Sequence, residues 1–293
     1  MLKHAYLILA HNEFIVLRSL VSCLDDERND IFIHFDRKVK EIPEISVSRS
    51  RLFILKNRVR VFWGDFSMVE AEERLFEAAV ANGPYSYYHL LSGVDLPIKS
   101  QDQIHDYFQR NAGKEFISFM DVSKAEIDYR MRYVHLFPKG FRRNPSFLYR
   151  LRGGIVLLQR GLLLKRNREV DLYKGSQWMS VTENMARLFI ESKAWIKKVF
   201  YHTFIPDEFV FQTLCMRSSI SESIHERSDE VSSNLRLINW SSGHWYVKDW
   251  SESDLPELEN SPAFFARKFN GTDPDFLKAV MALSKRRAGD EVR

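Results

Sequence analysis

Asp207 and Glu208 are adjacent carboxylates that follow Pro206 inside a run of large apolar residues, FIPDEFVFQT (204–213). A proline followed by acidic residues is an ordinary helix start, because proline fits the first helical position and carboxylates favour the positive end of the helix dipole. Alternatively, one carboxylate is a catalytic base whose pKa is raised because apolar neighbours exclude water. These residues alone leave both interpretations open.

Polar residues at the ends of apolar segments in the first half form a second candidate group. Ala10 ends one such segment and His11 follows it, while Asp36 follows another. Ligands of parallel sheets bind at the carboxyl ends of the strands, so we expect a nucleotide here, with Asp36 accepting a hydrogen bond from base or ribose and His11 beside it. Each residue could equally be an ordinary polar loop residue. GxGxxG and Walker-type motifs are absent from the sequence, so side chains would have to hold the phosphates.

Alternating strands and helices must position these residues. Short apolar runs predict buried strands, and apolar residues at helical spacing predict helices between them. The predicted strands are 3–10, 30–36, 59–63, 86–93 and 115–120, and the predicted helices are 14–24, 68–83 and 100–111. This alternation indicates an α/β, Rossmann-like fold with a mostly parallel central sheet and helices on both faces.

The second half of the chain is less regular. Residues 131–170 combine aromatic residues, arginines and turn formers with weak periodicity, which predicts a long functional loop or lid that contacts substrate. Gly175 indicates a close approach of the backbone to another segment. No repeat or low-complexity linker divides the sequence, so we expect a single domain of residues 1–293, with a nucleotide-binding half (about 1–120) and a catalytic and acceptor-binding half (about 121–280).

The composition is that of a globular protein with a sizeable core, since 45% of the 293 residues are hydrophobic. The 43 lysines and arginines against 39 acidic residues give a net charge of +4, which does not indicate a nucleic-acid-binding protein. Basic clusters occur at Arg142–Arg143, Arg150–Arg152 and Lys165–Arg168. Such clusters are usually solvated, and contact with an anionic lipid or an anionic glycan is the alternative.

Cysteine usage and the first residues suggest a location for the protein. Cys23 and Cys215 lie in apolar contexts without the spacing of a zinc site or a disulfide framework. The apolar run between His4 and His11 is too short for a membrane span, and no small-residue cleavage site follows it. We expect a reduced cytoplasmic protein without a transmembrane segment, with peripheral contact at the inner face of the membrane left open.

Seven segments, in order, resemble the core-2/I-branching N-acetylglucosaminyltransferase family (glycosyltransferase family 14), which also contains the peptide O-xylosyltransferases. The resemblance runs from about residue 3 to about residue 276. It implies a GT-A fold, a UDP-sugar donor, a glycan acceptor, inversion at the anomeric carbon and no cofactor or divalent metal. The segments are AYLILAHNE, IFIHFDRK, VFWGDFSMVEAEERLFEAA, YSYYHLLSGVDLPIKS, YKGSQWMSVTEN, IPDEFVFQT and FFARKF.

The resemblance also implies roles for particular residues. The glutamate of the PDE motif, here Glu208, would be the general base, with Asp207 as a structural or acceptor-binding neighbour. Lys268 of the C-terminal KF motif, with Arg267 beside it, would neutralise the diphosphate in place of a metal. The second basic residue of the family is not clearly reproduced. Two residues of SSGHWYVKD are candidates for it, His244 and Lys248.

Acceptor contacts are expected from two further segments that resemble the family. Trp240 would stack on the acceptor sugar through its flat apolar face, although a core tryptophan is the other interpretation. Arg130, Arg132 and Tyr133 resemble the basic and aromatic segment near the acceptor. The one DxD sequence, 273–275, is interpreted as a turn and helix start.

Other functions remain open from the sequence. A metal-dependent phosphohydrolase would draw its ligands from scattered residues that lack a compact spacing, and a non-catalytic glycan-binding protein would use the same aromatic surface. Within the family the donor could be UDP-N-acetylglucosamine, which we favour, or UDP-xylose. The ligands of the phosphohydrolase would be His11, His34, Asp36, Asp207 and Glu208.

Overall fold

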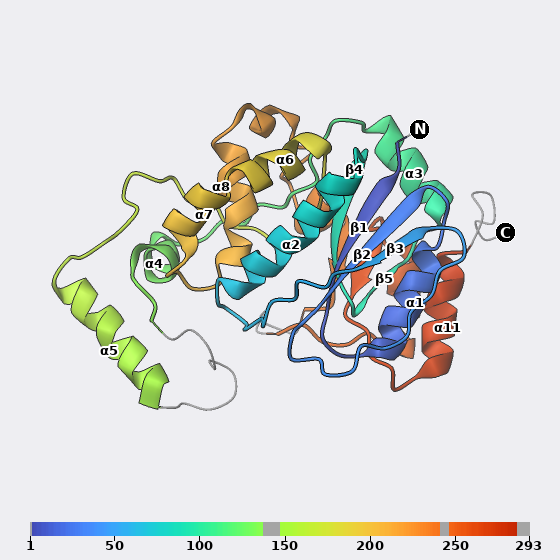
Figure 1. Cartoon of the computed structure of the whole chain (residues 1–293), viewed down its shortest axis with the longest axis horizontal. Coiled ribbons are helices and arrows are strands. Elements are labelled where there is room, and N and C mark those ends of the chain that lie inside the picture. Colours follow the sequence, from blue (N-terminus) through green and yellow to red (C-terminus); the bar gives the residue numbers. More distant parts are fainter. Residues whose placement is uncertain (1, 137–146, 241–245, 286–293) are drawn as a thin grey trace.

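The computed structural model describes residues 2–136, 147–240 and 246–285. Its centre is a sheet of five strands in the order β3-β2-β1-β4-β6, in which β1 to β4 are parallel and β6 is antiparallel (Figure 1). Every residue of β1, β2, β4 and β6 is buried, as expected when both faces of a parallel sheet are covered. The strands are β1 (His4–Ala10), β2 (Asn29–Phe35), β3 (Arg51–Ile54), β4 (Tyr87–Ser92) and β6 (Met179–Val181).

Helices cover the two faces of this sheet. Successive residues of β1 alternate between two hydrophobic clusters, with Leu7 in one and Ile8 in the other. The first face packs against α2 (Ser67–Asn82), α6 (Glu183–Glu191), α7 (Lys193–Phe200) and α8 (Val210–Met216). The second packs against α1 (Phe14–Leu24), α3 (Gln101–Arg110) and α11 (Pro274–Leu283).

A smaller sheet of three strands adjoins the carboxyl end of β4. Its order is β5 (Asp95–Pro97), β8 (Phe265–Arg267) and β7 (Arg236–Ile238). β5 pairs with β8 in antiparallel register, so that Asp95 lies opposite Arg267. The small sheet therefore brings the C-terminal FFARKF segment to the strand ends of the central sheet.

The remaining helices are short or peripheral. Helix α5 (Phe147–Gly161) lies at the margin of the molecule, away from the central sheet (Figure 1). Residues 131–170, predicted to be a loop or lid, thus contain a helix of 15 residues. The others are α4 (Lys124–Ile127), the π-helical turn η1 (Asp128–Arg132), the 3₁₀ turns η2 (Pro206–Glu208), η3 (Ser219–Ser223) and η4 (Glu252–Asp254), and helices α9 (Glu230–Asn234) and α10 (Leu255–Asn260).

The predicted α/β class with a mostly parallel sheet is confirmed, and so are the strands expected at 3–10, 30–36 and 86–93. The prediction of a strand at 59–63 is wrong, because the third strand, β3, lies earlier in the chain. The amide of Val59 instead donates to the imidazole of His34, 2.8 Å away, and its carbonyl accepts from Arg37. Residues 115–120 form isolated bridges in place of a strand.

Two further findings concern the sequence expectations. Cys23 and Cys215 are both buried and free of a disulfide. In the part of the chain that the structure describes, no helix has the combination of length and apolar character needed to cross a bilayer.

Candidate active site

The carboxyl ends of β1, β2 and β4 meet at one edge of the central sheet. The amide of Asp36 donates to the carbonyl of Ala10 at 2.9 Å, and the amide of Gly93 donates to Leu9 at 2.8 Å. A Cβ atom on Gly93 would lie 3.2 Å from that of Ala10, so glycine allows this close approach. The fold therefore brings Ala10 and Asp36 together, and His11 directly follows Ala10.

Charged residues from both the central sheet and the small sheet act on the pKa of His11. Partial burial lowers the pKa of His11, the carboxylate of Asp36 opposes the effect, and the cations Lys38 and Arg267 add to it. The carboxylate of Asp36 is 3.1 Å from the ammonium of Lys38. Arg267 of β8 thus lies close enough to the predicted nucleotide residues to act on them electrostatically.

Hydrogen bonds fix the loop after β8 against the strand ends. Glu13, which precedes α1, has a left-handed backbone (φ 49°), and its carboxylate accepts from the amide of Gly271 at 2.8 Å. The amide of Phe269 donates to the carbonyl of Val94 at 2.9 Å. The loops after β1, β4 and β8 consequently form one connected surface.

Arg267 and Lys268 are adjacent, yet their side chains have different surroundings. The Arg267 guanidinium lies 4.0 Å from the ring centre of Trp178 and 3.5 Å from the carboxylate of Asp95, and its side chain is only 14% exposed. The Lys268 ammonium is 3.6 Å from the carboxylate of Asp249, and its side chain is 40% exposed. Lys268 is therefore the more accessible cation to an incoming anionic group.

Trp240 and Lys248 follow β7, next to β8. The amide of Asn239 donates to the carbonyl of Arg267 at 3.1 Å, and the amide of Lys248 donates to Asn239 at 2.7 Å. Trp240 forms an isolated bridge with Val247 and is half-buried. The fold thus places both predicted residues near the predicted diphosphate cations, while His244 lies outside the described residues.

Glu208 ends the 3₁₀ turn η2, which is fixed on both sides. Before it, Ile205 has a left-handed backbone (φ 56°), and its amide donates to Gly64 at 3.0 Å. A β-branched residue in this conformation costs on the order of 1–3 kcal/mol, so the surrounding structure must hold it there. After the turn, Phe209 and Val210 are fully buried. The position of Glu208 is therefore set by the fold.

Two cations contact the carboxylate of Glu208. Its Oε2 atom is 2.7 Å from Nη1 of Arg130 and 3.7 Å from Nζ of Lys174. Glu126 pairs with the same cations, at 2.9 and 3.1 Å. The Glu208 side chain remains 33% exposed. A carboxylate held in this way has a defined orientation and is still open to an acceptor.

Asp207, not Glu208, is the acid that the apolar residues surround. It is 8% exposed, and burial raises its pKa to about 7, with a further contribution from Glu208. Glu72 of α2 is also buried, and its pKa is raised by burial and by Asp207. The dehydrated acid expected in FIPDEFVFQT therefore exists at Asp207, behind the exposed carboxylate.

The segment 174–178 joins the Glu208 turn to the small sheet. The amide of Gly175 donates to the carbonyl of Glu208 at 2.9 Å, while Trp178 lies under Arg267. Four residues of extended chain span at most roughly 14 Å, so the two regions border the same part of the molecule. A Cβ atom on Gly175 would overlap the carbonyl of Ser118, which confirms the close backbone approach expected there.

The sequence model of the Core-2/I-branching enzyme family matches residues 4–259, which is most of the chain. The chain belongs to the Core-2/I-branching enzyme family. The matched part includes the strand ends of the central sheet, the segment 174–178 and the turn with Glu208. It ends before Lys268.

Named relatives of this Core-2/I-branching enzyme are glycosyltransferases. Human N-acetyllactosaminide beta-1,6-N-acetylglucosaminyl-transferase is 23% identical over 288 residues, covering 90% of this chain and 67% of that protein. Xylosyltransferase oxt of Drosophila pseudoobscura pseudoobscura is 22% identical over 286 residues, covering 85% of this chain and 29% of that protein. The chain thus spans about two thirds of one relative and under a third of the other. It is a glycosyltransferase of this family.

Among solved structures, the apo crystal structure of mouse xyloside xylosyltransferase 1 aligns with 92% of this chain and 98% of that chain. The TM-score is 0.38 and the sequence identity is 11%.

The acceptor residues predicted for this enzyme are only partly brought together. Arg130 contacts Glu208 directly. The Arg132 side chain donates to the carbonyl of Val170 at 2.9 Å, and Tyr133 is only 5% exposed. These two side chains therefore contact other parts of the protein and not Glu208. Their role with an acceptor stays a prediction.

Lys174, Glu126 and Trp178 were missed as site residues by the sequence reasoning. They contact Glu208, its cations or Arg267 from segments far away in the chain. The glycine in YKGSQW was the one signal in the sequence that this segment lies against another. It did not indicate which side chains would face Glu208.

Within the ranges that the structure describes, no group of three or more His, Cys, Asp or Glu side chains is arranged to hold a metal ion. The ligand set of the phosphohydrolase alternative is therefore not assembled there. The DxD sequence is a helix start as interpreted, because the Asp273 side chain accepts from the amides of Asp275 and Phe276 at the beginning of α11.

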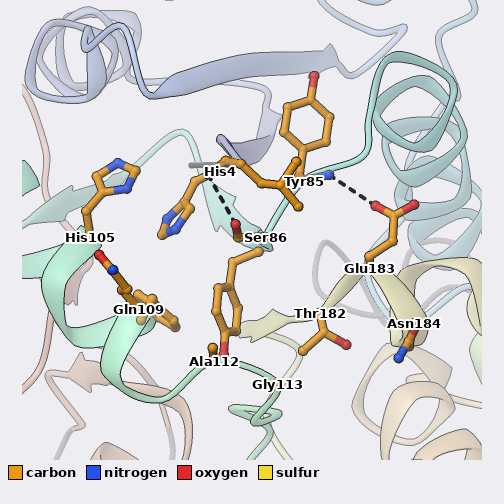
Figure 2. Close-up of a pocket in the computed structure, with 13 residues that line it drawn as sticks. His4, Tyr85, Ser86, His105, Gln109, Ala112, Gly113, Thr182, Glu183 and Asn184 are labelled. Atoms are coloured by element: carbon orange, nitrogen blue, oxygen red, sulfur yellow. Dashed lines mark hydrogen bonds between the residues drawn. The ribbon is translucent and has the colours of Figure 1, made fainter.

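A cavity of about 310 Å³ lies at the opposite edge of the central sheet (Figure 2). It is lined by the first residues of β1 and β4, His4 and Tyr87, and by His105 of α3. Glu183, on its far side, accepts from the amide of Tyr85 at 3.2 Å. Ligands of parallel sheets bind at the carboxyl ends of the strands, so we do not assign the transfer chemistry to this cavity.

Proposed function

We propose that this enzyme transfers N-acetylglucosamine from UDP-N-acetylglucosamine to a hydroxyl group of a glycan acceptor, with inversion and with Glu208 as the general base. The observation that carries the proposal is the position of Glu208: a carboxylate fixed on a short turn, oriented by Arg130 and one-third exposed. A general base needs a defined orientation and access to the proton it removes.

In the proposed reaction, Glu208 accepts the proton of the acceptor hydroxyl. The acceptor oxygen forms a bond to the anomeric carbon of the donor from the face opposite UDP. The bond between that carbon and the β-phosphate oxygen breaks, and UDP leaves with the electron pair. Proton transfer and bond formation both require the acceptor hydroxyl to be aligned with the carboxylate and the anomeric carbon. A carboxylate with a fixed position favours this alignment.

The donor is proposed to bind at the strand ends, with Asp36 and His11 near the nucleoside. Its diphosphate would meet Lys268, which is accessible, and Arg267, which is held between Trp178 and Asp95. Fixed cations near a departing diphosphate stabilise its developing charge in the way a metal would. We therefore propose a reaction without a metal ion, with Lys248 as the nearest described candidate for a second cation.

The preference for N-acetylglucosamine over xylose rests on the relatives. The human relative named above is an N-acetylglucosaminyltransferase and aligns with 90% of this chain at 23% identity, slightly more than the xylosyltransferase, which aligns with 85% at 22%. Xylose remains the second candidate donor.

A donor screen tests this function. UDP release is measured for a panel of nucleotide sugars, with and without a panel of oligosaccharide acceptors. We expect UDP-N-acetylglucosamine to give the fastest acceptor-dependent release. Faster release from UDP-xylose would change the donor, and no release from any UDP-sugar would overturn the proposed reaction.

A further inference from the structure

Helix α5 and the turn after it expose six leucines, here called the leucine patch. Their exposure ranges from 40% at Leu151 to 73% at Leu163. They are six of the fourteen large hydrophobic side chains that are exposed in the described ranges, and they lie within fourteen residues. A cluster of exposed apolar side chains of this kind on a protein surface marks an interaction site. The patch consists of Leu151, Leu157, Leu158, Leu162, Leu163 and Leu164.

The opposite face of α5 is docked on the rest of the enzyme. The Arg152 guanidinium lies 4.6 Å from the ring centre of Phe204, and Val156 is 3% exposed. The Gln159 side chain bonds both the amide and the carbonyl of Val134, at 2.8 and 3.0 Å. The helix is therefore held by one face and presents the leucine patch on the other. Figure 1 shows α5 at the margin of the molecule.

The charges around the leucine patch are mostly basic, although Asp128 pairs with Lys165 and Glu169 and Asp171 follow the segment. Between residues 148 and 168 there are six basic residues and no acidic residue. Arg150, Arg160 and Arg168 are exposed. The neighbouring end of α7 adds exposed Lys197 and Lys198, and it is joined to this segment by Arg166, which donates to the carbonyl of Lys198 at 2.8 Å.

We propose that the leucine patch docks on the surface of an anionic lipid bilayer. This surface goes beyond the proposed reaction. Leucines on one face with arginines and lysines around them match a helix that lies in the membrane interface, where apolar side chains enter the acyl boundary and cations reach lipid phosphates. The cations around the patch complement the phosphates of anionic lipids, which is why we propose a bilayer as the partner.

The length of α5 agrees with binding along the surface. Its 15 residues extend about 22 Å, which is short of the roughly 30 Å of hydrocarbon that a spanning helix must cross. The helix would therefore lie in the plane of the bilayer, with its docked face toward the enzyme.

A groove of about 690 Å³ adjoins this patch. Its lining includes Leu163 and Lys165, the acids Asp128 and Asp171, and Tyr173, the residue before Lys174. Lys174 in turn pairs with Glu208. If the proposed function holds, docking would present an acceptor carried by the bilayer to the acceptor side of the site.

Vesicle binding of the full chain tests this proposal. Flotation is measured with phosphatidylcholine vesicles, with and without phosphatidylglycerol, in the absence of donor and acceptor. We expect binding to the anionic vesicles that weakens as salt is added. The triple change Leu157→Gln, Leu158→Gln, Leu163→Gln should reduce it at least about tenfold, and Arg150→Gln with Arg160→Gln about fivefold per residue.

The matched control is Leu2→Gln with Ile42→Gln, two exposed apolar residues outside the leucine patch, which should leave vesicle binding unchanged. No binding to anionic vesicles, equal binding to neutral ones, or binding that the leucine changes leave intact would each overturn the proposal. Self-association that the same changes abolish, without vesicle binding, would assign the patch to a second copy. Because no sugar is transferred in this experiment, its outcome is independent of the proposed reaction. If the unaltered chain does not bind anionic vesicles, the proposal fails even where a variant folds poorly.

Discussion

The turn that carries Glu208 and the loop that carries Lys268 lie at the two ends of the segment 174–178, but the protein holds them differently. Glu208 has a guanidinium at 2.7 Å and a second cation at 3.7 Å. Lys268 has one carboxylate at 3.6 Å, with both side chains about 40% exposed. An exposed pair of this kind contributes little to stability and constrains a lysine weakly.

This difference suggests a division of labour. Glu208, the proposed base, is oriented by the folded chain alone, before any substrate binds. Lys268, the proposed cation for the diphosphate, is accessible and loosely held, so its final position would depend on the donor. Chemistry and donor binding should therefore respond separately to changes in the two regions.

The packing of segment 174–178, which links the two regions, can be disrupted at Gly175. In Gly175→Ala the new methyl group would overlap the carbonyl of Ser118, which is backbone and cannot move cheaply. We expect a loss of about 3 kcal/mol in the free energy of unfolding, measured by urea denaturation. Gly154→Ala on α5 is the control, since a Cβ there meets nothing within 4 Å and should be neutral or slightly stabilising. Equal stability of the two variants would contradict the close packing of this segment.

The donor side can be tested at Lys268. Lys268→Ala should weaken UDP binding and slow transfer by about a hundredfold, because the cation proposed to neutralise the diphosphate is lost. Excess chelator should leave the wild-type rate unchanged. Lys278→Ala, which removes an exposed lysine of α11, is the control for the change in net charge.

One outcome would reverse this assignment. If chelator abolished transfer and manganese restored it, the diphosphate would be neutralised by a metal. Asp95, Asp273 and Asp275 would then return as ligand candidates, and Asp95 would have to exchange its contact with Arg267.

Asp207, the buried acid next to Glu208, gives a pH prediction. Asp207 has a pKa of about 7 in the folded chain and an ordinary aspartate pKa near 4 when unfolded. Its protonation therefore favours the folded state fully at low pH, and this contribution is lost as pH rises toward 7. Relative to wild type, Asp207→Asn should gain about 2 kcal/mol of unfolding free energy between about pH 5 and about pH 8. A constant difference between the two proteins in denaturant titrations at both pH values would show that Asp207 is not buried as described.

The strands that the sequence could predict are those buried on both faces. β1, β2 and β4 are continuous apolar runs because helices cover both sides of them. β3 could not be found in this way, since its four residues lie at the sheet edge and are partly exposed. Residues 59–63 resemble a strand, but the amide of Val59 donates to the imidazole of His34 and not to a neighbouring strand. No local sequence pattern encodes this tertiary contact.

The site shows a similar limit. Glu208 could be singled out because its motif is local and resembles a known family. Its partners could not be assigned from the sequence. Arg130, expected only near the acceptor, and Lys174 reach Glu208 from distant segments, and Glu126 of α4 pairs with both of these cations. The sequence also suggested a dehydrated acid in this motif, and only the fold shows that burial falls on Asp207 and exposure on Glu208.

The role of Glu208 is tested most directly by the transfer rate of Glu208→Gln beside that of Asp207→Asn, at saturating donor and acceptor, with donor affinity measured by titration. If Glu208 is the base, its glutamine variant should lose transfer by roughly a hundredfold to ten-thousandfold. Its donor affinity and melting temperature should stay near wild type, and Asp207→Asn should have the smaller effect on rate. A near-normal rate in Glu208→Gln would contradict the catalytic assignment and leave the motif as the 3₁₀ turn before α8.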